Sequence, residues 1–172
     1  MSAVIETAQE KLEAHIRDLA KWAGYTEEGR AKYPSEYKAF FPGCYATPGA
    51  TELAERWGAF WMIQAVASYQ TVPRAIMADK PVPAGHEEVI TSNIRTKADA
   101  YLQQWEFERS ARGASLYLTP VDHDTGADKP RVLVQEFQPI CLRTDLFTVG
   151  TRLRFWCDCT PEGAFIMLPI EY

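Results

Sequence analysis

The chain has 172 residues and a formal net charge of −5, with 47% hydrophobic and 24% charged residues. These proportions are typical of a globular protein and argue against a disordered chain, and the length predicts one domain over residues 1–172. The acidic balance disfavours a nonspecific duplex-DNA binder, which needs clustered Lys and Arg side chains. It is also too weak for a protein that imitates the charge pattern of DNA.

The sequence contains no sign of export or of membrane insertion. Its four cysteines form no Cys-x-x-Cys pair, and its first residues lack the basic and then apolar pattern of a signal peptide. The longest apolar stretch, residues 57–67, is too short to span a bilayer and includes Gln64. We therefore expect a cytoplasmic protein with reduced thiols and no membrane role. The cysteines are Cys44, Cys141, Cys157 and Cys159.

The N-terminal segment has the pattern of an amphipathic helix. Apolar side chains recur at three- and four-residue intervals over residues 3–23, and Gly24 follows as a stop signal. The next segment, residues 25–45, is aromatic and irregular, and Pro34 and Pro42 limit any helix to a turn or two, so a packed loop with a short helix is expected. The apolar residues of the first helix are Ile5, Ala8, Leu12, Ile16, Leu19 and Ala23.

A second helix is predicted from Thr47 to about Gln70. The Thr47 hydroxyl can cap a free amide, and proline is favoured at the first helical position, which Pro48 occupies. From residue 57 to residue 67 the pattern is apolar nearly all round, which predicts a central, buried helix. Small residues at 58 and 59 would let another backbone approach it. Its aromatic residues are interpreted as core rather than as a ligand pocket, and they are Trp57, Phe60 and Trp61.

Strand patterns dominate the C-terminal part. Residues 71–103 read as a connection, with a weak helical pattern after residue 87. Alternation and β-branched or aromatic residues then predict strands, and the turn Thr160-Pro161-Glu162-Gly163 predicts a closing hairpin. The expected fold is α+β, with N-terminal helices packed on a C-terminal antiparallel sheet of about five strands. These strands are expected at residues 104–109, 115–121, 131–137, 151–159 and 164–169.

Three stretches resemble the DUF6876 domain, an uncharacterised bacterial family. The helix Leu53-Ala54-Glu55-Arg56-Trp57-Gly58-Ala59-Phe60-Trp61 followed by Ala67-Ser68-Tyr69-Gln70 is similar to a motif of that family, and so are residues 104–107 and the closing Leu168-Pro169-Ile170-Glu171-Tyr172. The resemblance covers about half of the chain, and residues 74–103 read as an insertion beside it. Because members of the family look like genes of phages and plasmids, the resemblance implies a mobile-element setting but no activity and no catalytic residues.

The loop at residues 122–128 is the sharpest polar cluster. Asp122, Asp124 and Asp128 are spaced so that their carboxylates could surround a hard cation such as calcium. However, Leu133 occupies the position at which an EF-hand loop has its bidentate glutamate, and aspartate is common in any loop between strands. A plain connecting loop is therefore favoured over a cation site.

Cysteine and histidine chemistry is weakly supported. Cys157 and Cys159 point to the same face of a predicted strand, but further ligands for zinc are not visible beyond Cys141 and His123. The three histidines lie in unrelated parts of the chain, and none of the common nucleotide-binding or hydrolase motifs occurs. We therefore expect no catalytic residues, no metal and no cofactor.

The predicted strand at residues 151–159 offers a candidate binding face. Alternation places Arg152, Arg154 and Trp156 on one side and apolar side chains on the other. Arginines beside an aromatic ring suit phosphate, a stacked base or an acidic protein surface, although a solvated strand face has the same pattern.

These observations favour a non-enzymatic interaction protein of a phage or other mobile element. It is expected to bind and inhibit a host protein complex, with an anti-CRISPR or anti-restriction inhibitor as its most concrete form. The expected contact surface is the helix-free face of the sheet or the acidic loop with Asp122, Asp124 and Asp128. One alternative is a small-ligand or nucleic-acid-binding module that uses the Arg152, Arg154 and Trp156 face. Another is a metal-dependent enzyme built on the loop at residues 122–128 or on the cysteines.

Overall fold

The computed structural model describes residues 6–19, 37–41, 43–70, 101–120, 130–160 and 163–172. The helices in this part of the chain are α1 (Ala8–Leu19), α3 (Pro48–Trp57), α4 (Phe60–Ala67) and the short 3-10 helix η3 (Pro169–Glu171). The strands are β1 (Lys38–Phe41), β2 (Cys44–Ala46), β3 (Tyr101–Arg109), β4 (Ala114–Pro120), β5 (Val132–Phe137), β6 (Arg152–Thr160) and β7 (Gly163–Met167).

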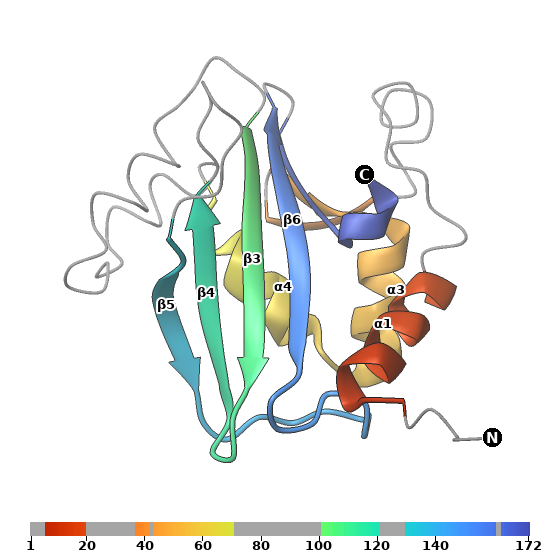
Figure 1. Ribbon diagram of the computed structural model, residues 1–172. Coiled ribbons are helices and arrows are strands. Elements are labelled where there is room, and N and C mark those ends of the chain that lie inside the picture. Colours follow the sequence, from red (N-terminus) through yellow and green to blue (C-terminus); the bar gives the residue numbers. More distant parts are fainter. Residues whose placement is uncertain (1–5, 20–36, 42, 71–100, 121–129, 161–162) are drawn as a thin grey trace.

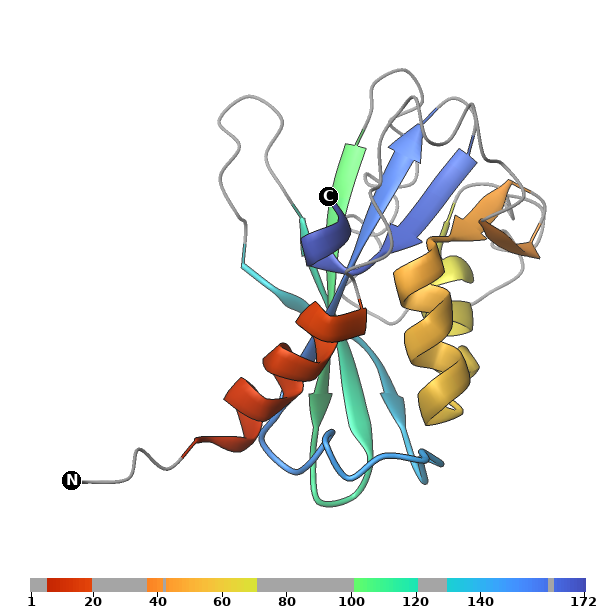
Figure 2. The same cartoon turned by 90° about the vertical axis from the view of Figure 1, so that its right-hand side faces the viewer.

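All of these strands belong to one sheet, in the order β1-β2-β7-β6-β3-β4-β5 (Figure 1). Neighbouring strands are antiparallel except β2 and β7, which run parallel. Helices α3 and α4 lie on one side of the sheet, whereas α1 lies beside the edge of β6 and packs on α3 (Figures 1 and 2). The predicted α+β class is confirmed. The prediction of an antiparallel sheet of about five strands is wrong, because this sheet is mixed and has seven.

The two additional strands come from the segment that we expected to be a packed loop. Residues 38–41 and 44–46 form β1 and β2, and Phe41 pairs with Cys44 across a tight reversal. Strands of four and three residues are too short to display the alternation on which a strand prediction depends. The rest of the expected loop, residues 25–36, lies outside the described residues.

Helix α1 confirms the first predicted helix over a shorter range. Leu12 and Leu19 are buried, in agreement with the expected apolar face. The helix starts with a reciprocal pair that the prediction missed: the Thr7 backbone amide donates to the Glu10 carboxylate at 2.7 Å, and the Glu10 amide donates to the Thr7 hydroxyl at 3.2 Å. This capping box satisfies two amides at the start of the helix. Residues 3–5 and 20–24 of the prediction lie outside the described residues.

The helix expected over residues 47–70 consists of two helices. Thr47 caps α3 as predicted, and its hydroxyl accepts from the Ala50 amide at 3.4 Å, while Pro48 takes the first helical position. At the other end Gly58 adopts a left-handed conformation with φ 63° and ψ 34°, which ends α3 before α4 begins. Gly58 therefore serves as a helix stop, a role that the prediction missed. Another segment of backbone also lies close to it, because the Arg143 amide donates to the Trp57 carbonyl at 2.7 Å.

The C-terminal strands fall within a few residues of their predicted ranges. The main difference is at β3, which begins at Tyr101 and so includes residues that had a weak helical pattern. Its partners are β4 on one side and β6 on the other. Pairing on both sides explains why these residues form a strand despite their weak helical pattern, because every backbone group of a central strand can hydrogen-bond to a neighbouring strand. Residues 71–100 of the expected connection lie outside the described residues.

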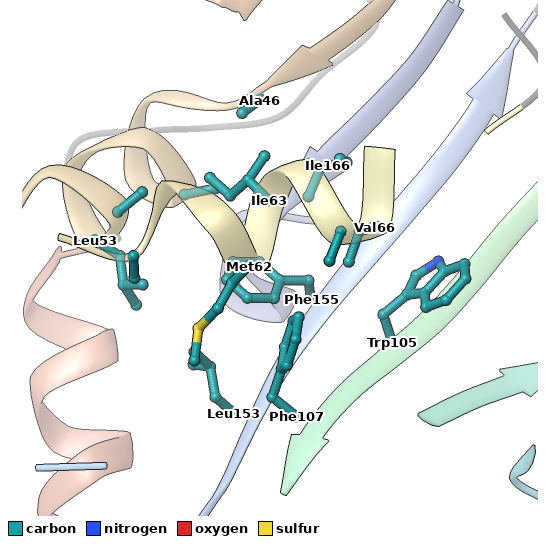
Figure 3. Close-up of a cluster of buried hydrophobic side chains, with 14 of the residues drawn as sticks. Ala46, Leu53, Met62, Ile63, Val66, Trp105, Phe107, Leu153, Phe155 and Ile166 are labelled. Carbon is teal, nitrogen blue, oxygen red and sulfur yellow. The ribbon is translucent and has the colours of Figure 1, made fainter. Parts of the chain in front are cut away.

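The core lies between α4 and the inner face of β3, β4 and β6. Met62, Ile63 and Val66 of α4 are fully buried above Phe107 and Phe155 of the sheet (Figure 3). The apolar periodicity of the sequence therefore places α4 correctly as the central helix. Of the three aromatic residues assigned to the core, Trp57 is buried, and Phe60 and Trp61 are half-buried and pack against the core cluster.

A buried carboxylate joins the end of the described chain to the start of α3. Glu171 is 3% exposed and accepts three short hydrogen bonds: from the Thr47 hydroxyl at 2.7 Å, the Gly49 amide at 2.9 Å and the Leu168 amide at 2.7 Å. An added Cβ at Gly49 would lie 2.5 Å from Glu171 Oε1, so only glycine leaves room for the carboxylate. The helix N-terminus also favours a negative charge.

Replacement of Trp61 by alanine is expected to reduce the free energy of unfolding by roughly 2 kcal/mol, below the ~3–5 kcal/mol typical of a fully buried aromatic residue. The indole ring contacts Phe107 and Phe137 at centroid distances of 5.6 and 5.0 Å, but the side chain is only half-buried. Urea unfolding measures the loss, with Trp61→Phe as the control that keeps the ring contacts. An unchanged stability of the alanine variant would contradict the core assignment.

Candidate binding surface

The face of the sheet opposite α3 and α4 is the candidate binding surface, and we call it the outer face. On β6, Leu153 and Phe155 are fully buried under the helices, so the residues between them point outward, as alternation predicts. The same alternation holds on β3 and β4. The outer face carries Glu106 and Glu108 from β3, Tyr117 from β4, and Arg152 and Arg154 from β6.

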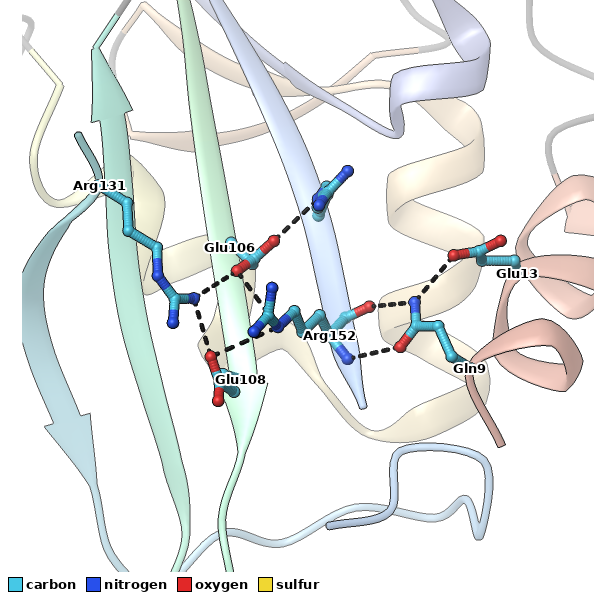
Figure 4. A network of polar contacts seen from close by, with 7 residues as sticks. Gln9, Glu13, Glu106, Glu108, Arg131 and Arg152 are labelled. Atoms are coloured by element: carbon cyan, nitrogen blue, oxygen red, sulfur yellow. Dashed lines mark hydrogen bonds and ion pairs between the residues drawn. The ribbon is translucent and has the colours of Figure 1, made fainter. Parts of the chain in front are cut away.

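Five charged side chains form what we call the Arg–Glu network on this face (Figure 4). Glu106 lies directly opposite Arg154 in the β3–β6 ladder, and its carboxylate accepts from Arg154 Nε at 2.8 Å. Glu108 lies opposite Arg152, whose Nε is 3.5 Å from Glu108 Oε2 and 3.8 Å from Glu106 Oε1. Arg131, next to β5, donates to both carboxylates, at 2.7 and 2.8 Å.

Arg131 is held from two directions. Its guanidinium group lies over the Tyr117 ring, 4.0 Å from the centroid, while its Nη1 atom contacts the two carboxylates. The carboxylate of Glu108, together with that of Glu106, raises the pKa of Arg131 above its ordinary value. Arg131 is therefore a fixed positive charge at the β5 side of the outer face.

The network contributes little to stability in relation to its size. The arginine side chains are 36 to 60% exposed, and exposed ion pairs are each worth only about 0–1 kcal/mol. Three guanidinium groups face two carboxylates, so the network carries both signs with one excess positive charge. A surface with closely spaced charges of both signs can recognise a partner whose charges are arranged in the complementary way.

Apolar side chains flank the network. Trp156, which we predicted to lie beside the arginines, is half-buried and packs against the small cluster of Tyr37, Phe165 and Met167. Its ring also meets Tyr172 edge-on at a centroid distance of 5.3 Å. The exposed apolar contact area next to the network therefore comes from other residues: Tyr172 at 65% and Ile170 at 51% exposure near β6, and Leu133 at 37% opposite Tyr117 on β5.

Helix α1 closes the edge of β6 beside the network. The side chain of Gln9 pairs with the backbone of Arg152, accepting from its amide at 2.8 Å and donating to its carbonyl at 3.1 Å (Figure 4). It also donates to Glu13 at 3.0 Å. These contacts place the polar face of α1 next to the outer face of the sheet.

The sequence also singled out other candidate site residues. Asp122, Asp124 and Asp128 lie outside the described residues. Cys157 is fully buried on the core side of β6. In the described part of the chain, no three His, Cys, Asp or Glu side chains are grouped so that they could hold a metal ion.

Sequence reasoning found the two arginines of β6 but missed their partners. Glu106 and Glu108 have the same two-residue spacing on β3 as Arg152 and Arg154 have on β6, and this matching of opposite charges was the available signal. The signal could not be used because the sequence does not specify which distant strand pairs with β3. Arg131 was missed for the same reason.

The chain was compared with protein-family models, curated proteins and solved structures. No family model matches it, and neither a curated protein nor a solved structure matches it. The resemblance to DUF6876 proteins therefore stays a prediction. None of the helices in the described part of the chain has the length and apolar character that a membrane span needs.

Proposed function

We propose that the protein is a non-enzymatic interaction protein whose outer face binds a partner protein. The observation that supports this most is the position of exposed Tyr172 and Ile170 beside an Arg–Glu network of both charges. Tyrosine and arginine are enriched in protein interfaces, where apolar anchors are combined with complementary charges. The resemblance to DUF6876 proteins extends the proposal to a mobile-element inhibitor of a host complex, acting in the cytoplasm, with an anti-CRISPR or anti-restriction role as its concrete form.

The charges of the outer face favour a protein partner over a nucleic acid. Arg131 and Arg154 already donate to Glu106 at 2.7 and 2.8 Å, and the carboxylates between the arginines would repel phosphate groups. Trp156 is half-buried and its ring is in contact with Tyr172, which leaves little of it for stacking on a base. Both observations weigh against the nucleic-acid-binding alternative for this face.

Charge reversal at two network arginines tests the proposal. The double variant Arg131→Glu, Arg154→Glu is expected to weaken partner binding at least tenfold, because it places four carboxylates on a surface that had three guanidinium groups and two carboxylates. The measurement is affinity capture from host lysate at low and moderate salt, followed by the dissociation constant for the purified partner.

The matched control is Arg56→Glu, which reverses an exposed arginine on α3 that pairs with Glu52 at 2.6 Å. It is expected to keep full partner binding. Equal binding by both variants would contradict the use of the outer face. Retention of nucleic acid alone, with affinity that falls steeply as salt rises, would replace a protein partner with a phosphate backbone.

A further inference from the structure

We propose that a pocket between α1, β6 and η3 binds a small organic anion, namely a carboxylate or phosphate group on an apolar body. The pocket has a volume of about 250 Å³. Three arginines contribute to its wall, Arg17 from α1 and Arg152 and Arg154 from β6. The inference does not rest on the proposed function, because α1 and η3 supply most of the wall and the Arg–Glu network shares only two residues with it.

The charge of the wall favours an anion. Within the wall, one carboxylate stands against the three guanidinium groups, that of Glu13, which already accepts from Gln9 at 3.0 Å. Glu106 and Glu108, which pair with Arg152 and Arg154, are not part of the wall. Arg17 makes no ion pair with any other described residue. Arg154 contacts the network through its Nε atom, at 2.8 Å from Glu106. Within the described structure its terminal amino groups are therefore available to a ligand, and the planar guanidinium group suits carboxylate and phosphate equally.

The backbone of β6 adds a donor and an acceptor at the same place. The amide and carbonyl of Arg152 point toward α1, where Gln9 binds both. Because backbone groups of an antiparallel strand alternate in direction, those of Arg154 point the same way. The ladder between β6 and β7 begins only at the Trp156–Met167 pair, so Arg154 has no strand partner on this side among the described residues. The edge between Gln9 and β7 is therefore open for one residue.

The remaining wall sets the size and character of the ligand. Ile16 of α1 and Pro169 and Ile170 of η3 are apolar, so they favour an alkyl or aromatic body next to the anionic group. A volume of about 250 Å³ is at the small end for ligand sites, which typically measure roughly 300–1,000 Å³. It can take a single ring with one anionic group, and it is too small for a nucleotide.

Titration of the full chain, followed by ¹H–¹⁵N nuclear magnetic resonance, tests the proposal with phenyl phosphate and benzoate as probes. Saturable shifts are expected for Gln9, Arg17, Arg154 and Ile170. Tighter binding of phenyl phosphate would assign the site to phosphate esters, and tighter binding of benzoate would assign it to carboxylates. Benzylamine has the same ring with a positive charge and is expected not to bind.

Two variants connect this binding to the pocket. Arg17→Gln is expected to weaken binding of the better probe at least tenfold without changing the melting temperature, because Arg17 lies exposed on α1. Ile170→Asp, at a position 51% exposed, is expected to abolish binding. The matched control is Arg112→Gln, an exposed arginine in the β3–β4 turn, which is expected to bind as the unmodified chain does. Unsaturable shifts, binding of benzylamine, or equal affinity of the Arg17→Gln variant would each overturn the proposal.

Discussion

Replacement of Phe107 by alanine is expected to reduce the free energy of unfolding by about 4–5 kcal/mol, at the upper end for a core aromatic residue. Phe107 is fully buried on β3 and contacts three aromatic rings, those of Trp61 at 5.6 Å, Phe137 at 5.9 Å and Phe155 at 6.1 Å between centroids. Its removal leaves a cavity where α4, β5 and β6 meet. Because rigid strands line two sides of this cavity, it cannot readily collapse.

Urea unfolding followed by circular dichroism measures this loss, and Phe107→Leu is the control. Leucine fills most of the same space, so a cost below about 2 kcal/mol is expected for it. The dependence of the unfolding free energy on urea should keep the same slope in both variants, because the surface exposed on unfolding stays similar. A loss below about 2 kcal/mol in the alanine variant would show that the core closes around the missing ring.

Replacement of Glu171 by alanine is expected to cost roughly 3 kcal/mol or more, although the change removes a charge from the interior. The substitution leaves the Thr47 hydroxyl and the amides of Gly49 and Leu168 without their acceptor, and each unsatisfied buried donor costs about 1–3 kcal/mol. Gly49→Ala should also destabilise, because its Cβ would displace the carboxylate. The double variant should cost less than the sum of the two, since each change disrupts the same contact. Additive losses would contradict a direct link between Gly49 and Glu171.

The stability that Glu171 provides should also depend on pH. Burial raises the pKa of this carboxyl group above its ordinary value of 4.5, although the hydrogen bonds from Thr47, Leu168 and Gly49 lower it in part. Because the folded-state pKa is the higher one, the group's stabilising contribution is complete below about pH 4.5 and declines as the pH rises through the folded-state value. The stability difference between the native chain and Glu171→Gln should shrink over this range. A difference that grows with pH would indicate a lowered pKa.

The sequence allowed correct predictions where the signal is local. The Thr47-Pro48 dipeptide marked the start of α3, and alternation along β6 separated the arginine face from the core face. Errors arose where structure depends on distant residues or on short elements. A glycine at position 58 is compatible in the sequence both with the end of a helix and with the close approach of another backbone. The two charged strands β3 and β6 become neighbours only in the folded sheet, so the sequence does not show that their charges pair.

The parallel pairing of β2 with β7 bears on how the chain folds. Thr47 and Glu171 are in contact although 124 positions separate them in the sequence, whereas the β3–β4 and β6–β7 hairpins join neighbours. Closing a loop of that length requires an unfavourable loss of chain entropy before any contact compensates for it. Local hairpins can form early, but the β1–β2 hairpin and strand β7, which are far apart in the sequence, must find each other afterwards. The folding rate should therefore be limited by this long-range encounter, in the range of high-contact-order proteins rather than helical bundles.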